Sequence, residues 1–258
     1  MGRKRKRCIK DRVWTFELIP GKADYLKEGQ KLFETYQVKV TDEDGGETTV
    51  EVLIGITGTN DAPVIDSTIS VTGGVAEDTA GSSVATGQLV ATDPDNDTAP
   101  NTDLTWSDIT TNPSQYGNFV LDSGTGEWTF QIDNTLPAVQ ALSEGQSVTE
   151  TFTVQVSDGI GTDTQDVVIT ITGTNDAPVA QNASVDVDED ASITGNVTAT
   201  DIDLPAGSSL NYTTTSTATG LTFNSDGSYS FDASSYDSLS KGETLVIQVP
   251  YTASDEQS

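Results

Sequence analysis

The sequence predicts an all-β protein built from tandem β-sandwich repeats. A nine-residue string, Ile-Thr-Gly-Thr-Asn-Asp-Ala-Pro-Val, occurs at 56–64 and again, unchanged, at 171–179, a spacing of 115 residues. Between the two copies, short runs of alternating apolar and polar residues are separated by turn residues, and no long helical period is present. Many short strands that recur at a fixed interval are typical of sandwich repeats.

Weaker matches extend the repeat in both directions and divide the chain. Trp14-Thr15-Phe16 corresponds to Trp128-Thr129-Phe130, and Tyr229-Ser230-Phe231 is a third copy. We therefore expect four segments. They are a basic leader at 1–12, artefactual or disordered; the C-terminal half of a first repeat at 13–60; a complete second repeat at 61–176; and a third repeat at 177–258 that lacks its last strand.

Within the second repeat, alternation and turn residues predict the strands. We expect one strand over 84–92, a hairpin of 118–121 with 127–132 whose turn glycines take positive φ angles, and a short helical turn over 136–142. Two antiparallel strands should carry one apolar face into the core. The expected core side chains are Phe119, Trp128, Phe130, Phe152, Val154, Val156, Ile169 and Ile171.

The charge is strongly acidic and excludes several kinds of partner. The chain has 40 acidic and 12 basic residues, and only five of the basic residues lie beyond position 12. Such a surface repels nucleic acid and anionic membranes. No apolar stretch is long enough to span a bilayer, so an export signal would have to lie outside this chain.

The absence of histidine excludes histidine-dependent catalysis and the usual zinc sites. The chain has no histidine, and its one cysteine, Cys8, lies in the basic leader. Ser-His-Asp triads, Cys-His pairs and the usual zinc sites are therefore excluded. Without disulfides, the repeats must be held together by their cores or by metal ions.

Several motifs, in one order and at matching spacings, resemble the VCBS repeat family, a group of cadherin-like domains in large bacterial surface proteins. The motifs are Tyr116-Gly117-Asn118-Phe119, Gly126-Glu127-Trp128-Thr129-Phe130, the run 136–142, Val156-Ser157-Asp158-Gly159 and the run 172–179. The resemblance covers residue 13 to the end. It implies tandem Greek-key, cadherin- or Ig-like sandwiches in an extracellular adhesin of the bacterial cell surface, of the repetitive RTX type, exported by type I secretion and acting in attachment and biofilm.

The same resemblance implies calcium as the cofactor, because cadherin junctions bind it with carboxylates from two adjacent domains and their linker. Calcium takes six to eight oxygen ligands of this kind. The implied ligands at the junction of the second and third repeats are Glu77, Glu144, Asn175, Asp176, Asp201, Asp203 and Asp255. Those at the junction of the first and second repeats are Glu28, Asn60, Asp61, Asp93, Asp95 and Asp158.

Two departures from the cadherin pattern weaken the transfer of ligands, one in the linkers and one that would alter a site beyond the third repeat. Gly58 and Gly173 stand where the cadherin linker carries an aspartate, so each junction has one ligand fewer. Lys241 replaces the glutamate of the third repeat. Any single aspartate in these loops is better explained as a turn residue that hydrogen-bonds nearby backbone. The joint pattern favours calcium, because clustered carboxylates without a cation repel one another.

Three functions compete on the sequence alone. The first is a calcium-stiffened spacer or adhesive stalk whose expected partners are the neighbouring repeats and surface glycans or the adhesins of other cells. The second is a glycan- or ligand-binding sandwich module of a secreted RTX-type protein. Here Trp14 and Trp128 are expected in the core, and Trp106 fits either a core or a ligand site. The third, an enzyme with paired carboxylates, is not expected, because the acidic positions recur from repeat to repeat.

Overall fold

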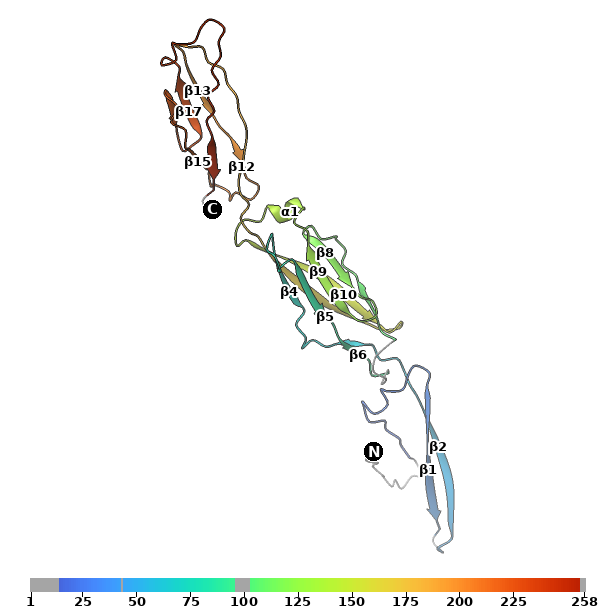
Figure 1. The fold of residues 1–258 in the computed structure, drawn as a ribbon. Helices are drawn as coiled ribbons and strands as arrows, with labels where there is room; N and C mark the ends of the chain where they lie inside the picture. Colours follow the sequence, from blue (N-terminus) through green and yellow to red (C-terminus); the bar gives the residue numbers. More distant parts are fainter. Residues whose placement is uncertain (1–13, 43, 96–102, 256–258) are drawn as a thin grey trace.

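The computed structural model is an elongated row of three β-rich units, and it describes residues 14–42, 44–95 and 103–255. Figure 1 shows the first repeat at one end of the row, the second in the middle and the third at the other end. The basic leader lies outside the described residues. No helix in the described part of the chain is long and apolar enough to cross a membrane. The fold is all-β, as the sequence predicts.

The second repeat is a sandwich of two sheets. One sheet has the strand order β4-β11-β10-β7 and the other has the order β5-β9-β8. A two-residue ladder, β3 with β6, closes one end of the sandwich. The elements are β3 (Val64–Ile65), β4 (Thr72–Ala76), β5 (Val84–Gln88), β6 (Ala91–Thr92), β7 (Thr105–Asp108), β8 (Gly117–Leu121), β9 (Glu127–Ile132), α1 (Pro137–Gln140), β10 (Ser147–Ser157) and β11 (Thr162–Thr172).

The core of the second repeat lies between these two sheets, as the alternation predicts. Phe130, Val154 and Ile169 are fully buried, and Phe119 packs against this cluster with part of its surface exposed. The Phe119 and Phe152 rings stack at a centroid distance of 4.3 Å, which joins one sheet to the other. Alternation of side chains across each strand places these residues on one side.

Two details of the second repeat differ from the sequence prediction. The expected single strand over 84–92 is two strands, because β5 pairs with β9 in one sheet and β6 pairs with β3 at the end of the sandwich. The chain changes hydrogen-bond partners at Leu89 and Val90: Leu89 bonds to Gly126 and Val90 to Asp66. No local sequence pattern reveals these neighbours. In the 122–126 turn, Gly126 has a positive φ of 74° and Gly124 does not.

The first repeat consists mainly of one long hairpin. Its strands β1 (Lys31–Thr41) and β2 (Glu47–Thr57) are antiparallel over all 11 residues. The prediction that Trp14 packs in the core is wrong, since its side chain is 59% exposed and lies outside any strand. Its second-repeat counterpart Trp128 is buried, and so is Trp106.

The third repeat has the same topology as the second in its first half. Its strands are β12 (Val179–Ala180), β13 (Ser192–Asn196), β14 (Ala199–Thr200), β15 (Asn211–Thr214), β16 (Leu221–Phe223), β17 (Ser228–Asp232) and β18 (Tyr251–Ser254). The pairing of Ile193 and Leu221 with Phe231 repeats the pairing of Ala85 and Phe119 with Phe130. The repeated sequence therefore folds with one register.

Candidate functional site

The candidate site is the linker between consecutive repeats together with the strand ends that surround it. At the junction of the second and third repeats, Asn175 and Asp176 follow β11 and precede β12. Asp201 and Asp203 lie directly after β14, which pairs with β12, and Asp255 lies directly after β18. Pairing of the short strands β12 and β14 holds the aspartate loop beside the linker.

A chain of hydrogen bonds connects these side chains. The Asn175 amide nitrogen Nδ2 donates to Asp255 Oδ2 at 3.0 Å. The backbone N–H of Asp176 donates to Asp203 Oδ2, and the backbone N–H of Asp203 donates to Asp201 Oδ1, both at 3.3 Å. The linker and the two loops of the third repeat therefore form one connected polar cluster.

The junction of the first and second repeats is built in the same way. Asn60 Nδ2 donates to Asp158 Oδ2 at 3.0 Å, and the N–H of Asp61 donates to Asp95 Oδ2 at 2.7 Å. The N–H of Asp95 donates to Asp93 Oδ1 at 2.9 Å. The short pair of strands β3 and β6 takes the place of β12 and β14. Because the same contacts recur at both junctions, they are a property of the repeat and not of one particular turn.

The second repeat adds glutamates to the junction that follows it. Glu77, at the end of β4, is fully buried; its Oε1 accepts a hydrogen bond from Gln140 and its Oε2 accepts one from the N–H of Thr174. The exposed Glu144 accepts a hydrogen bond from the N–H of Asn175 at 3.1 Å. Glu28, the counterpart of Glu144 in the first repeat, is exposed.

Several carboxylate oxygens in these clusters are buried without a hydrogen-bond partner. Among the described residues they are Asp95 Oδ1, Asp176 Oδ2, Asp201 Oδ2 and Asp203 Oδ1. Buried polar atoms are nearly always paired in native structures, so each orphan oxygen needs an explanation such as an ion. Asp95 and Asp203 occupy equivalent positions in the two clusters, and the same atom is orphaned in both.

Burial and mutual repulsion disfavour the charged forms of these carboxyl groups. Burial, together with the charges of Asp176 and Asp78, raises the pKa of Glu77 to about 7. Burial also raises the pKa of Asp176, Asp201 and Asp93, and neighbouring aspartates add to each rise. The pKa of Asp158 is lowered, since the hydrogen bonds from Ile160, Gly161 and Asn60 outweigh its burial.

In their present positions the acidic groups do not converge into a ready metal site. Within residues 14–42, 44–95 and 103–255, no group of three or more His, Cys, Asp or Glu side chains is arranged to hold a metal ion. Instead, Asp203 and Asp201 each turn one carboxylate oxygen toward a backbone N–H, that of Asp176 and that of Asp203. The donor set is nonetheless all oxygen and rich in carboxylate, which is the set that calcium prefers.

The two glycines that depart from the cadherin pattern have a structural cause. A Cβ atom on Gly173 would overlap the backbone carbonyl of Leu142, and one on Gly58 would overlap that of Leu26. Both glycines also exchange backbone hydrogen bonds with the preceding loop, between Gly145 and Gly173 and between Gly29 and Gly58. An aspartate cannot occupy these positions unless the loop moves. Lys241 is exposed on the corresponding loop of the third repeat.

Sequence reasoning missed Asp78. Its charge raises the pKa of both Glu77 and Asp176, and its carboxylate accepts a hydrogen bond from Asn134 at 2.7 Å. Asp78 has a positive φ of 44°, and Asp190 at the equivalent position has a φ of 64°. The Glu-Asp pair at 77–78 and 189–190 was the signal that could have identified it.

Comparison with known proteins relates the sequence to two families of bacterial domains. Residues 60–173 match the family model of the bacterial cadherin-like domain, and residues 175–258 match that of the bacterial Ig domain. None of the curated proteins matches the chain in sequence.

Several solved cadherin structures resemble the chain at low identity. Human protocadherin-24 EC1-2 is 20% identical with a TM-score of 0.40, over 76% of this chain and 94% of that chain. Mouse cadherin-23 EC22-24 is 17% identical with a TM-score of 0.48, over 87% and 69% of the two chains. The structure described as PcdhgB3 EC1-4 is 15% identical with a TM-score of 0.49, over 88% and 62%.

Proposed function

The chain carries domains of the bacterial cadherin-like and bacterial Ig families, and from this premise we propose that it is a calcium-stiffened spacer or adhesive stalk of a bacterial surface adhesin. Domains of these families are typically extracellular modules without catalytic activity. The finer role in attachment and biofilm, the RTX type and the type I export route belong to this proposal. The division of the chain into a half repeat, a complete second repeat and a third repeat without its last strand is also part of this proposal.

The observation that carries the proposal is the duplicated carboxylate cluster. Both junctions place an Asn-Asp linker against two aspartates of the following repeat, and both bury the same orphan oxygen, on Asp95 and on Asp203. Aspartates that acted only as turn residues would be exposed, and none of their oxygens would be buried without a hydrogen-bond partner. A divalent cation bound there would supply the missing partner and would neutralise the repulsion that raises these pKa values.

We propose that Glu77, Glu144, Asp176, Asp201, Asp203 and Asp255 hold calcium at the junction of the second and third repeats, with Asn175 as a linker ligand. The corresponding set at the other junction is Glu28, Asn60, Asp61, Asp93, Asp95 and Asp158. When bound, calcium supplies the positive charge that fixes the two repeats relative to each other. The protein side chains provide the oxygen donors and connect the linker to both neighbouring repeats.

The first prediction is that the chain binds calcium through Asp203. Titration calorimetry of the 258-residue chain should give weak binding, in the range of about 10⁻⁴–10⁻³ M typical of extracellular modules. Asp203→Ala should lower the affinity of one junction at least about tenfold, because it removes a buried carboxylate.

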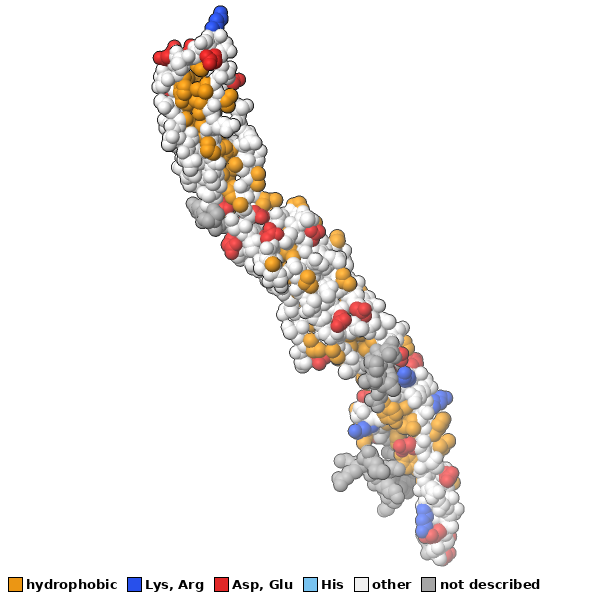
Figure 2. Space-filling view, in the orientation of Figure 1, with side chains coloured by type: hydrophobic (Ala, Val, Ile, Leu, Met, Phe, Trp, Pro, Cys, Tyr) orange, Lys and Arg blue, Asp and Glu red, His pale blue; other side chains and the backbone are white. Residues whose placement is uncertain are grey.

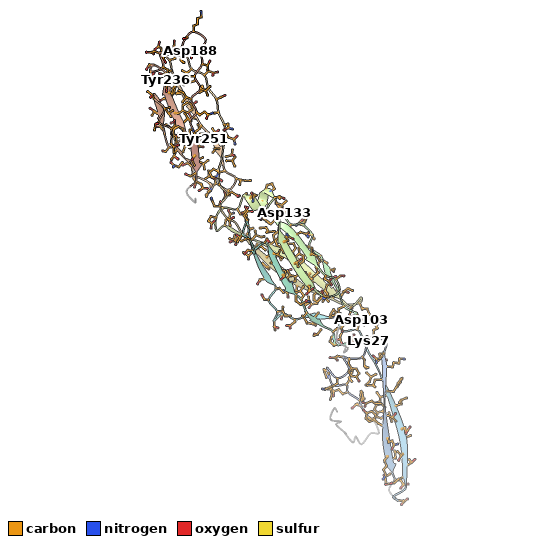
Figure 3. All side chains as sticks on the ribbon, viewed as in Figure 1. Lys27, Asp103, Asp133, Asp188, Tyr236 and Tyr251 are labelled. Atoms are coloured by element: carbon orange, nitrogen blue, oxygen red, sulfur yellow. The ribbon has the colours of Figure 1, made fainter. Side chains whose placement is uncertain are left out.

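Asp188→Ala is the matched control. Asp188 is exposed at the far end of the third repeat, away from the junction (Figure 3), so its loss should leave calcium binding unchanged. Absence of calcium binding by the wild-type chain, or equal binding by the Asp203→Ala variant, would reject the calcium proposal and leave these aspartates as turn residues.

A further inference from the structure

The short helix α1 stands beside the junction of the second and third repeats. Figure 1 shows it at the end of the second repeat that faces the third. Pro137 opens the helix, and the buried side chains of Val139 and Leu142 anchor it to the core. Gln140, the last residue of the helix, lies between these two anchors in sequence and is half-buried. The core of the second repeat therefore fixes the backbone from which the Gln140 side chain extends.

The Gln140 side chain holds the buried carboxylate of Glu77. Its Nε2 donates a hydrogen bond to Glu77 Oε1 at 2.8 Å, and the N–H of Thr174 donates to Glu77 Oε2 at 3.3 Å. Glu77 is fully buried, and neither of the ion pairs found among the described residues involves it. Gln140 therefore provides the shorter of the two hydrogen bonds to this carboxylate.

The surface around this junction is acidic. In the space-filling view, acidic side chains lie where the second and third repeats meet, and no Lys or Arg lies among them on the face shown (Figure 2). A buried carboxylate oxygen that loses its donor has neither water nor a protein partner, which is costly. Without Gln140, Glu77 would therefore no longer be held in its present position from both sides.

The loop after α1 does not itself require a glutamine. In the first and second repeats the carbonyl of a leucine, Leu26 or Leu142, lies against the linker glycine in the same way. Two residues before this leucine stands Asp24 in the first repeat and Gln140 in the second, and the third repeat has Asp237 at this position. An ionised aspartate has no proton to donate to a carboxylate. The role of Gln140 therefore lies in its contact with Glu77 and not in the fold of the loop.

We propose that Gln140 is a positioning residue of the calcium site at the junction of the second and third repeats. It keeps the Glu77 carboxylate beside the linker before the metal arrives, so that less ordering is needed on binding. Gln140 acts through Glu77 and is not a ligand. The inference rests on the calcium function proposed above. In metal sites, loss of a residue that orients a ligand typically lowers metal affinity about 10- to 100-fold.

The test is a calcium titration of the 258-residue chain followed by NMR, in which each backbone amide reports its own surroundings. The amide of Asn175 reports the second junction, and the amide of Asn60 reports the first. Gln140→Met keeps the length of the side chain and removes its donor. It should raise the calcium concentration at the Asn175 midpoint at least about tenfold. The Asn60 midpoint should not move, because Gln140 belongs to the other junction.

Gln131→Met is the matched control. Gln131 is exposed on β9 of the same repeat, so the same substitution there should leave both midpoints unchanged. The fluorescence of the buried Trp106 and Trp128 reports whether the second repeat remains folded in each variant.

Two further measurements show whether Gln140 acts through Glu77. In a Glu77→Gln protein the carboxylate is already absent, so adding Gln140→Met should lower the calcium affinity no further. In chelator, hydrogen exchange of the Thr174 amide should be about fivefold faster in Gln140→Met than in the wild type. The reason is that a Glu77 side chain held from one side only leaves this amide more often.

The outcomes separate this inference from the calcium proposal. If the Asn175 amide of the wild-type chain does not respond to calcium, the calcium proposal fails and this inference fails with it. If it responds and Gln140→Met has the wild-type midpoint, only the positioning role is wrong. A loss of affinity that persists in the Glu77→Gln background would also overturn the inference, since Gln140 would then act through another group.

Discussion

Glu77 is the residue whose environment departs most from that of an ordinary surface carboxylate. It is fully buried, and its pKa is raised to about 7 by burial and by the charges of Asp176 and Asp78. Two hydrogen bonds, from Gln140 and Thr174, hold it in place without neutralising it. In the absence of a cation, ionisation of this group therefore opposes folding.

The second prediction follows from the sign of this shift. A carboxyl group whose pKa is higher in the folded than in the unfolded state stabilises the fold below its unfolded pKa, and that stabilisation is lost as the pH rises through the folded value. In chelator, the melting temperature of the second repeat should therefore fall between pH 5 and pH 8. The loss due to Glu77 is at most about 3 kcal/mol, at 1.36 kcal/mol per pKa unit.

Glu77→Gln is the variant that isolates this effect. It keeps the size of the side chain and removes its charge, so the pH dependence between 5 and 8 should flatten. Aspartates with a lowered pKa, among them Asp122 and Asp133, stabilise the fold as the pH rises. They titrate at lower pH, so they do not contribute to the change in stability between pH 5 and pH 8. A slope that is unchanged in the Glu77→Gln protein would show that Glu77 is not its source.

Gly173 shows why the linker aspartate of the cadherin pattern has no counterpart in this chain. The sequence revealed a missing aspartate but not its cause, which is the close approach of the Leu142 carbonyl. Asp78 escaped sequence reasoning for a related reason, since its influence on Glu77 and Asp176 depends on how the end of β4 meets the linker. Contacts between distant segments of this kind leave no local pattern.

The strands and their register were the most predictable part of the molecule. The alternation of Phe152, Val154 and Val156 with polar residues is a local signal, and the structure buries all three. The division of 84–92 into β5 and β6 was not predictable, because it depends on which strands lie alongside. Trp14 was misplaced because its repeat counterpart Trp128 owes its burial to a complete sandwich around it.

The third prediction compares the two equivalent hairpins. Phe152→Ala should destabilise the second repeat by about 3–5 kcal/mol, because it removes a buried ring that stacks on Phe119. Tyr36→Ala removes a half-buried ring that lies 6.2 Å from Phe16 in the first repeat, outside the core of the second, so it should leave the main unfolding transition almost unchanged. Denaturant unfolding followed by tryptophan fluorescence measures both. Equal losses of stability in the two variants would mean that the first hairpin contributes to the same cooperative unit as the second repeat.

At the scale of the whole molecule, the three repeats form an extended row joined by short linkers (Figure 1). Among the described residues, Ser143 Oγ donates a hydrogen bond to the backbone carbonyl of Asp203 at 2.6 Å and so links the second repeat to the third. An ion pair between Lys27 and Asp103 at 3.7 Å links the first repeat to the second (Figure 3), but both side chains are largely exposed. Exposed ion pairs contribute at most about 1 kcal/mol, so they cannot fix the angle between two domains. The calcium sites proposed at the carboxylate clusters are therefore the expected source of rigidity.

The most direct test of this account is small-angle scattering of the 258-residue chain, diluted until sedimentation shows single copies, with millimolar calcium and with chelator. Calcium should give a long and narrow distance distribution, because it fixes both junctions. Chelator should broaden the distribution and shorten its mean, since repelling carboxylates no longer hold the linkers at 60–63 and 175–178. Asp203→Ala in calcium should fall between the two. A distribution that is the same with calcium and with chelator would contradict the central claim that these junctions are stiffened by the metal.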